Sequence, residues 1–209
     1  NVVTSIELER MLSASGPWGG EVRRPSDSEH PRKVAFIQCV GSRDISCNQG
    51  YCSSVCCMYA TKEAVIAREH DSNVEPTIFY MDVRSFGKGF ERYIERAEEE
   101  YGVRYVRSMV SMVTGVPGTG NLRLKHATPD GKNVEEEFDL VVLSVGLRPP
   151  EGTRELAERL GVGLNEYGFA EPPPFEPGRT TRAGIFVAGA FSEPKDISET
   201  VMEASCAAA

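Results

Sequence analysis

The residues best suited to chemistry in this 209-residue chain are four closely spaced cysteines, namely Cys39, Cys52, Cys56 and Cys57. They fall where an apolar strand at 32–42 is predicted to turn into a helix at 52–70. In a nucleotide-binding Rossmann fold this turn carries glycines, and the helix N-terminus seats a pyrophosphate. Thiols at that position indicate a bound metal centre, and therefore electron transfer rather than hydride transfer from a nicotinamide.

The spacing alone leaves three interpretations of these thiols open. Four thiolates complete a [4Fe–4S] cluster, and cluster iron prefers such ligands. Zinc usually takes pairs of the form Cys-x2–4-Cys, and Cys52 with Cys56 makes one such pair. The adjacent Cys56 and Cys57 also suggest a thiol–disulfide switch, although neighbouring cysteines rarely close a disulfide without strain. Ligand preference favours the iron–sulfur cluster.

The distribution of the cysteines points to a reducing compartment. Five of the six cysteines lie within 39–57, whereas a secreted disulfide scaffold would spread them over the fold. We therefore expect a metal or redox site in a cytoplasmic protein. Cys47 is expected to be a spare thiol in the loop, and Cys206 a small buried side chain.

A helix starting near residue 52 would present the thiols together. Cys52 and Cys56 are four residues apart and would share one helix face. Cys57 is rotated from Cys56 by about 100°, which still allows both to reach a cluster at the helix start. Cys39 would enter from the end of the preceding strand. The positive end of the helix dipole would favour an anionic cluster.

The elements that must position these thiols alternate between strands and helices, which indicates an α/β protein. We predict a three-layer Rossmann-like domain of the FAD/NAD(P)-binding type, with a β-hairpin insertion and a partial FAD-domain segment at the C-terminal end. Residues 1–31 are assigned to the FAD domain, 32–147 to the NAD-like domain with the cysteines, and 148–209 again to the FAD domain. The predicted strands are 76–83, two within 103–116, a hairpin over 122–139, 140–146 and 183–190, and the predicted helices are 3–13, 90–101, 154–160 and 196–209.

Composition excludes some classes of function. The net charge of −8 and the pI near 5.1 argue against a general nucleic-acid binder. No stretch approaches the ~18 apolar residues of a membrane span, and the N-terminus lacks the basic and apolar regions of a signal peptide. A lone strand and helix after residue 180 cannot bury both faces of a sheet. The helix at 3–13 is likewise predicted to have no strand before it, so we expect a piece of a longer polypeptide.

Several stretches of sequence carry a family resemblance that covers nearly the whole chain. The order DLVVLSVGLRP, a proline-rich loop, TTRAGIFVAGA and a helix resembles the C-terminal part of flavoproteins of the thioredoxin reductase type. Within that superfamily, FIQCVGSRD, YCSSVCCMYATKEA, MDVRSFGKGFE and FVAGAFSEPKDISETV resemble the family of heterodisulfide reductase A subunits. The resemblance implies a [4Fe–4S] cluster near an FAD, held by Cys39, Cys52, Cys56 and Cys57.

The resemblance also implies a flavin edge, although no GxGxxG motif occurs, so the FAD site in this chain is incomplete. The expected cofactor-binding residues are Gly146, Lys88, Gly189, Ala190, Asp196, Ile197 and Ser198. In this interpretation the start of the last helix faces the flavin, and its dipole stabilises the negatively charged reduced ring. The competing interpretations are an ordinary strand–loop–helix with Asp196 only as N-cap, and a solvated turn lysine at Lys88.

The function implied by the resemblance is flavin-based electron bifurcation, with the cluster as an electron relay and no catalytic side chain assigned in this chain. The implied partners are other heterodisulfide reductase subunits, hydrogenase or formate dehydrogenase modules and ferredoxin, with a homodimer in the full-length form. Neither nucleic acid nor membrane is expected as a partner. The alternatives are a zinc-stabilised, non-catalytic interaction domain and a fragment of a pyridine-nucleotide disulfide oxidoreductase.

Overall fold

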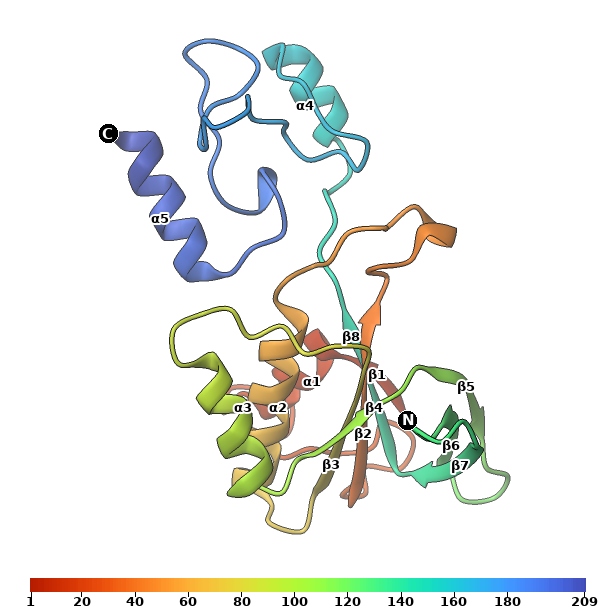
Figure 1. The fold of residues 1–209 in the computed structure, drawn as a ribbon. Helices are drawn as coiled ribbons and strands as arrows, with labels where there is room; N and C mark the ends of the chain where they lie inside the picture. The colour runs from red at the N-terminus through yellow and green to blue at the C-terminus, as the bar shows by residue number, and fades with distance from the viewer. The chain divides into compact units, whose positions relative to one another are not determined.

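The computed structural model describes residues 1–209, which form two compact units (Figure 1). The first unit comprises residues 1–40 and 56–145, and the second comprises 41–55 and 146–209. The chain therefore leaves the first unit once, returns to it at the cysteine pair, and leaves it again after residue 145.

A five-stranded sheet in the order β1-β8-β2-β3-β4 forms the centre of the first unit. All four strand pairs are parallel. The inner strands β2 and β8 are nearly continuous apolar runs, as expected for strands covered on both faces. The bounds are β1 Val2–Thr4, β2 Lys33–Val40, β3 Glu75–Tyr80, β4 Arg104–Arg107 and β8 Leu140–Val145.

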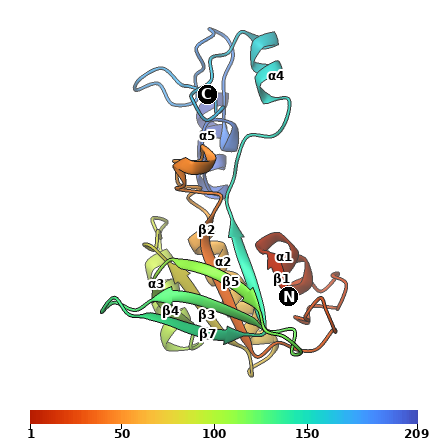
Figure 2. The ribbon, with the colours of Figure 1, turned by 90° about the vertical axis from the view of Figure 1, so that its right-hand side faces the viewer.

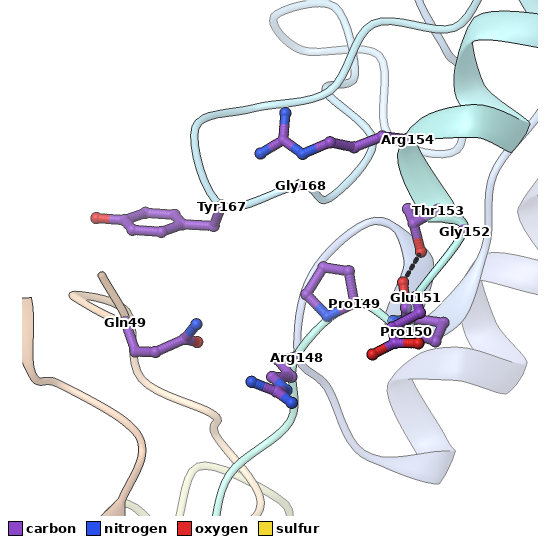
Figure 3. A pocket seen from close by; sticks show the side chains of 10 residues that line it. All are labelled: Gln49, Arg148, Pro149, Pro150, Glu151, Gly152, Thr153, Arg154, Tyr167 and Gly168. Carbon is purple, nitrogen blue, oxygen red and sulfur yellow. Dashed lines mark hydrogen bonds between the residues drawn. The ribbon is translucent and has the colours of Figure 1, made fainter. Parts of the chain in front are cut away.

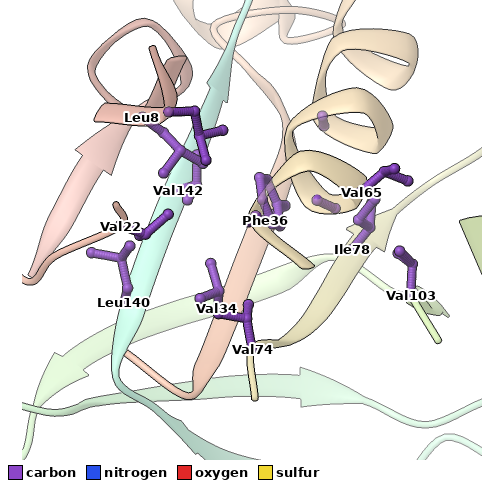
Figure 4. Close-up of a cluster of buried hydrophobic side chains, with 14 of the residues drawn as sticks. Leu8, Val22, Val34, Phe36, Val65, Val74, Ile78, Val103, Leu140 and Val142 are labelled. Atoms are coloured by element: carbon purple, nitrogen blue, oxygen red, sulfur yellow. The ribbon is translucent and has the colours of Figure 1, made fainter. Parts of the chain in front are cut away.

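Three helices cover one face of this sheet: α1 (Ser5–Leu12), α2 (Cys56–His70) and α3 (Phe90–Glu99). Thr4 and Glu7 form a capping box at the start of α1. The side chains between these helices and the sheet form one apolar cluster, with Leu8, Phe36 and Val142 fully buried (Figure 4). This cluster is the main core of the unit.

A three-stranded antiparallel sheet covers the opposite face of the parallel sheet (Figure 2). It consists of β5 (Val110–Gly115), β6 (Leu122–Ala127) and β7 (Asn133–Phe138). The predicted hairpin over 122–139 forms as β6 and β7, and it turns at 129–131, where Gly131 takes a φ of 81°. Helices, parallel sheet and antiparallel sheet therefore make three layers, and the predicted Rossmann-like fold class is confirmed.

The second unit has little regular structure. Its helices are α4 (Thr153–Leu160) and α5 (Ile197–Ala208), with the 3-10 turns η1 (Ile45–Cys47) and η2 (Gly189–Phe191). Its buried apolar cluster contains only Val162, Ala170 and Val187, with a few partly buried neighbours. Most of the unit is therefore held by turns and by side-chain hydrogen bonds to the backbone.

The structure corrects three predictions. The strand predicted at 183–190 does not form: a single bridge joins Arg179 to Phe186, and no neighbouring strand within this unit extends it. The first helix does follow a strand, since β1 pairs with β8. This pairing also places residues 1–31 in the first unit rather than with the C-terminal segment. None of the helices is long and apolar enough to cross a membrane.

Candidate functional site

Cys39 lies in a strained part of β2, close to its carboxyl end. Its φ is +61°, and the pairing of β2 with β8 shifts register between Ile37 and Val40. A non-glycine residue in the left-handed region costs about 1–3 kcal/mol and tends to occur at functional sites. The irregularity acts as a bulge, which redirects the side chain from its place in the pleat. The backbone therefore holds the Cys39 thiol in an orientation that a regular strand would not give.

Cys56 and Cys57 begin α2 and meet Cys39 there. Both are buried, with exposed fractions of 2% and 6%. Hydrogen bonds to the thiols of Cys39 and Cys57, together with burial, raise the pKa of Cys56. The hydrogen bond from Cys56 in turn lowers the pKa of Cys57. Three of the four predicted ligand thiols therefore lie together within the first unit.

The loop after β3 completes the surroundings of this thiol group. The Cys57 Sγ donates to the backbone carbonyl of Asp82 at 3.8 Å, and the backbone of Arg84 also approaches the thiol. The thiols thus sit beyond the carboxyl ends of β2 and β3, the edge at which open α/β sheets bind their ligands. This placement agrees with the expectation that thiols occupy the region of a pyrophosphate site.

The prediction that Cys52 lies on the same helix as Cys56 is wrong. Helix α2 begins at Cys56, so Cys52 lies outside it, in the second unit, and does not share a helix face with Cys56. The helix cannot extend back to Cys52, because Ser54 takes a left-handed backbone with a φ of 64°. The preceding Ser53 is fully buried, and its Oγ accepts from the amide N of Leu147 at 2.9 Å. The Cys52 Sγ accepts from the amide N of Ser54 at 3.3 Å.

The thiols of Cys39, Cys56 and Cys57 are the type of ligand that an iron–sulfur cluster uses. Cluster iron binds thiolates, and in the first unit the thiol of Cys56 is hydrogen-bonded to those of Cys39 and Cys57. Cys56 and Cys57 are buried. No group of three or more His, Cys, Asp or Glu side chains is arranged to hold a single metal ion.

The remaining cysteines are exposed. Cys47 lies in η1, where its Sγ donates to the carbonyl of Asp44 at 3.4 Å. Cys206 is exposed on α5, so the prediction that it is a buried side chain is wrong. Neither residue belongs to the thiol group of the first unit, and both can therefore serve as controls in substitution experiments.

The structure gives Gly146 a packing role. A Cβ at this position would lie 2.1 Å from the Oγ of Ser53 and 2.2 Å from the Oγ of Ser42. Those two hydroxyls are themselves hydrogen-bonded to each other and buried. Only glycine fits against them, so the absence of a side chain is explained without a cofactor.

The other predicted flavin residues are distributed over both units. Lys88 is exposed in the turn before α3, in the first unit, and forms no hydrogen bond or ion pair. In the second unit, Gly189 donates its amide to the Oε2 of Glu203 at 2.8 Å, and Ala190 is exposed in η2. Asp196 caps α5 by accepting from the amide of Glu199 at 2.7 Å.

The start of α5 has the features required of an anion-facing helix end. Ile197 and Ser198 are both exposed, as the prediction requires. The first backbone amides of a helix lack partners inside the helix, and the helix dipole is positive at this end. The assignment of this helix end to a flavin stays a prediction, and the carboxylates of Asp196 and Glu199 accept from amides at the helix start.

Two buried charged groups were not found from the sequence. The side chain of Lys195 is 4% exposed and pairs with Glu203. Burial raises the pKa of Glu203, but the interactions with Lys195, the amide of Gly189 and Ser192 together outweigh burial and keep this pKa below its usual value. Glu63 of α2 is 1% exposed, and burial raises its pKa to about 8. The residues around Glu63 in the sequence did not indicate that its side chain is buried.

Comparison with known proteins establishes the class. Residues 50–209 match the family described as pyridine nucleotide-disulphide oxidoreductase. This match covers more than half of the chain, and the chain belongs to that family. It is therefore an oxidoreductase module with the FAD/NAD(P)-binding type of fold.

Curated relatives show which members of this family the chain resembles. The chain is 48% identical over its whole length to one of the A-type iron–sulfur subunits of CoB–CoM heterodisulfide reductase in Methanopyrus kandleri. It is 47% identical, again over its whole length, to the A-type iron–sulfur subunit of the same reductase in Methanocaldococcus jannaschii. The predicted resemblance to heterodisulfide reductase A subunits is confirmed. The chain spans 32% of the length of each of these relatives.

A solved structure supports the fold alone. The 2-naphthoyl-CoA reductase in complex with 2-naphthoyl-CoA aligns with 99% of this chain and 23% of its own, at a TM-score of 0.52 and 14% identity. At this level of identity the likeness concerns the arrangement of strands and helices, and it says nothing about substrate.

Proposed function

We propose that this chain is the thiol-bearing electron-transfer module of a heterodisulfide-reductase-type subunit. Cys39, Cys52, Cys56 and Cys57 would hold a [4Fe–4S] cluster, which when bound supplies one-electron transfer. The observation that carries the proposal is the group of three hydrogen-bonded thiols at the carboxyl edge of the parallel sheet, one of them on a strained backbone. The relatives' names, which describe iron–sulfur subunits, support the same assignment.

The chain's own residues would then do two things. The start of α2 and the loop after β3 enclose Cys56 and Cys57, which excludes water from the thiols. Exclusion of water strengthens electrostatic interactions and helps to set a redox potential. The start of α5, with Asp196, Ile197 and Ser198, would supply one edge of an FAD site whose remainder requires more than this chain.

The wider role follows from the names of the relatives. One relative, at 44% identity, is the A-type subunit of the H2:CoB–CoM heterodisulfide, ferredoxin reductase of Methanothermobacter thermautotrophicus. A reductase with two acceptors of this kind fits flavin-based electron bifurcation, in which this chain would relay single electrons. We propose as partners the other subunits of such a complex, ferredoxin, and hydrogenase or formate dehydrogenase modules, with a homodimer of the longer subunit. The six free thiols fit a cytoplasmic location.

The test is the metal content of the 209-residue chain, purified and reconstituted without oxygen. We expect about four irons and four sulfides per chain, with broad absorbance near ~400 nm, since four thiolates complete a cubane. Stoichiometric zinc without iron would instead support the metal-stabilised interaction domain. A metal-free chain with a reversible disulfide would support the pyridine-nucleotide disulfide oxidoreductase alternative.

Single Cys→Ser variants assign the ligands. Cys39→Ser, Cys56→Ser and Cys57→Ser are each expected to lose most of the iron and the visible absorbance, and Cys52→Ser is expected to do the same. Cys47→Ser and Cys206→Ser are the matched controls, because both thiols are exposed and lie outside the group. Equal iron in the Cys56→Ser variant and in the controls would refute the cluster assignment.

A further inference from the structure

Two buried polar side chains in the parallel sheet of the first unit have no hydrogen-bond partner. They are Gln38 of β2, which is 9% exposed, and Ser144 of β8, which is 0% exposed. Both the amide nitrogen and the amide oxygen of Gln38 are unpaired. Buried polar groups in proteins are nearly always paired, so each exception calls for an explanation. A cavity of about 270 Å³ in the second unit does not supply one, because neither residue lines it (Figure 3).

Gln38 and Ser144 lie side by side on the face of the sheet that the helices cover. The strands β2 and β8 are paired up to the residue before each of them. Paired strands lie about 4.8 Å apart, and every second residue of a strand points to the same face. Phe36 and Val142, two positions earlier, lie in the apolar cluster under the helices (Figure 4). The two unpaired side chains therefore continue this cluster at the carboxyl edge of the sheet.

The start of α2 lies over this edge. In the first turn of α2, the Tyr59 hydroxyl donates to the carbonyl of Val145 at the end of β8. Because β2 and β3 are parallel, α2, which joins them, runs in the opposite direction to β2. Phe36 lies beside α2 (Figure 4), and Gln38 is about 6.6 Å further along the strand, towards the end of the helix at which Cys56 is the first residue.

The thiols of Cys39 and Cys56 meet at the same place. In a regular strand Cys39 would point away from the face that Gln38 occupies. Its left-handed backbone breaks this alternation, and its thiol reaches that of Cys56, which is buried on the helix side. The unpaired amide of Gln38 is therefore next to the thiol group, and the unpaired hydroxyl of Ser144 is one strand further away.

We propose that the amide of Gln38 and the hydroxyl of Ser144 donate hydrogen bonds to the sulfur atoms of the cluster that these thiols would hold. The inference rests on the proposed electron-transfer function. Gln38 offers two N–H donors and Ser144 offers one O–H donor. Hydrogen bonds to the sulfurs are among the factors that set the reduction potential of a cluster. Donors stabilise the more negative, reduced state, so these two residues raise the potential.

The first experiment is a redox titration of the 209-residue chain, reconstituted without oxygen and followed by its visible absorbance. Gln38→Met removes the amide at similar volume. It should make reduction about tenfold less favourable, which equals about 59 mV for one electron. Ser144→Ala should lower the potential by less, because it removes one donor that lies further from Cys39.

Ser5→Ala is the matched control for this titration. The side chain of Ser5 is 1% exposed, and Ser5 follows the residue of β1 that pairs with β8. Its hydroxyl is therefore the next in the same row, one strand further from Gln38, and it lies beside Tyr59. The potential of this variant should equal that of the wild type. Equal potentials in the Gln38→Met and Ser5→Ala variants would overturn the proposal.

Resonance Raman spectra in H2O and in D2O test the hydrogen bonds themselves. Deuterium on a donor that contacts sulfur shifts the iron–sulfur stretching bands. Gln38→Met should lose part of the shift that the wild type shows, and Ser5→Ala should keep all of it. A full shift in the Gln38→Met variant would show that Gln38 pairs with buried water instead, and would refute the proposal.

Folding and iron content separate this inference from the proposed function. In the metal-free chain, Gln38→Met should be at least as stable as the wild type in urea, followed by Trp18 fluorescence, because an apolar side chain replaces an unpaired amide. A wild-type chain that binds no cluster would refute the electron-transfer proposal and this inference together. A full complement of iron with unchanged potentials in the variants would refute this inference alone.

Discussion

The first unit buries a continuous apolar core, whereas the second unit is held mainly by polar contacts between loops. In the first unit, Phe36, Leu140 and Val142 are fully buried in strands that have neighbours on both sides. In the second unit, the buried groups include Ser53 and Lys195, each held by hydrogen bonds or ion pairs. A rigid core suits residues that must hold a geometry, and the thiol group of Cys39, Cys56 and Cys57 lies in the unit that has one.

The last helix shows the same difference between the units. None of the residues of α5 is buried, and Ile197, Val201 and Met202 are among the exposed large apolar side chains. By contrast, α1 of the first unit buries Leu8, which is 0% exposed. Helix α1 therefore contributes to the core of its unit, whereas α5 is stabilised chiefly by its cap and by Glu203.

The largest expected effect compares a leucine in each unit. Leu140→Ala should lower the free energy of unfolding of the first unit by about 3–5 kcal/mol, because it opens a cavity in a closed core. Leu164→Ala, at the half-buried cluster of the second unit, should cost only about 1–2 kcal/mol, because the space stays open to solvent.

Trp18, the single tryptophan, packs against the main core and reports unfolding of the first unit by fluorescence in urea. Amide hydrogen exchange reports the second unit. Equal costs at the two leucines would contradict the contrast between a closed and an open core.

Glu63 gives the first unit a pH dependence of stability. Burial raises its pKa from 4.5 to about 8, so the folded chain binds this proton more tightly than the unfolded chain. Stability should therefore fall as the pH rises from about 4.5 to about 8. Glu63→Gln should remove this fall and stabilise the unit at pH 9 by on the order of 3 kcal/mol, with little effect at pH 5.

The measurement is urea unfolding followed by Trp18 fluorescence at pH 5, 7 and 9. Glu95→Gln is the control, because Glu95 is exposed on α3 and is expected to leave the pH dependence unchanged. A parallel shift of both variants at every pH would show that Glu63 is not the titrating group.

The smallest expected effects come from two matching capping boxes, one in each unit. Thr4 caps α1 with Glu7, and Asp196 caps α5 with Glu199. Replacing either cap with alanine should cost about 1 kcal/mol of helix stability. Thr4→Ala should shift the Trp18 unfolding transition, because α1 is packed into the core.

Asp196→Ala should instead lower helicity and speed amide exchange in α5, and leave the Trp18 transition unchanged. A shift of that transition by Asp196→Ala would show that α5 is coupled to the core of the first unit.

Local patterns in the sequence predicted most of the first unit. The apolar strand at 140–146 and the hairpin over 122–139 each depend on neighbouring residues, and both are confirmed. The strand predicted at 183–190 failed because a strand needs a partner, and the apolar run alone could not supply one. The three-residue strand β1 was missed because it is too short to show a period.

The sequence likewise predicted some features of the candidate site and missed others. The spacing of the cysteines and the surrounding motifs indicated thiol chemistry and the correct family. Helix α2 starts later than predicted and excludes Cys52, where Ser54 takes a left-handed backbone and Ser53 accepts from the amide of Leu147, 94 positions away.

The sequence by itself determined which residues can bind soft metals, and it determined most of the strands and helices of the first unit, because both are properties of residue type and local period. Only the tertiary structure decided the left-handed backbone of Cys39, its contact with the thiol of Cys56, and the burial that raises the pKa of Glu63. These features arise where segments distant in the chain pack together, and desolvation and strain are properties of that packing.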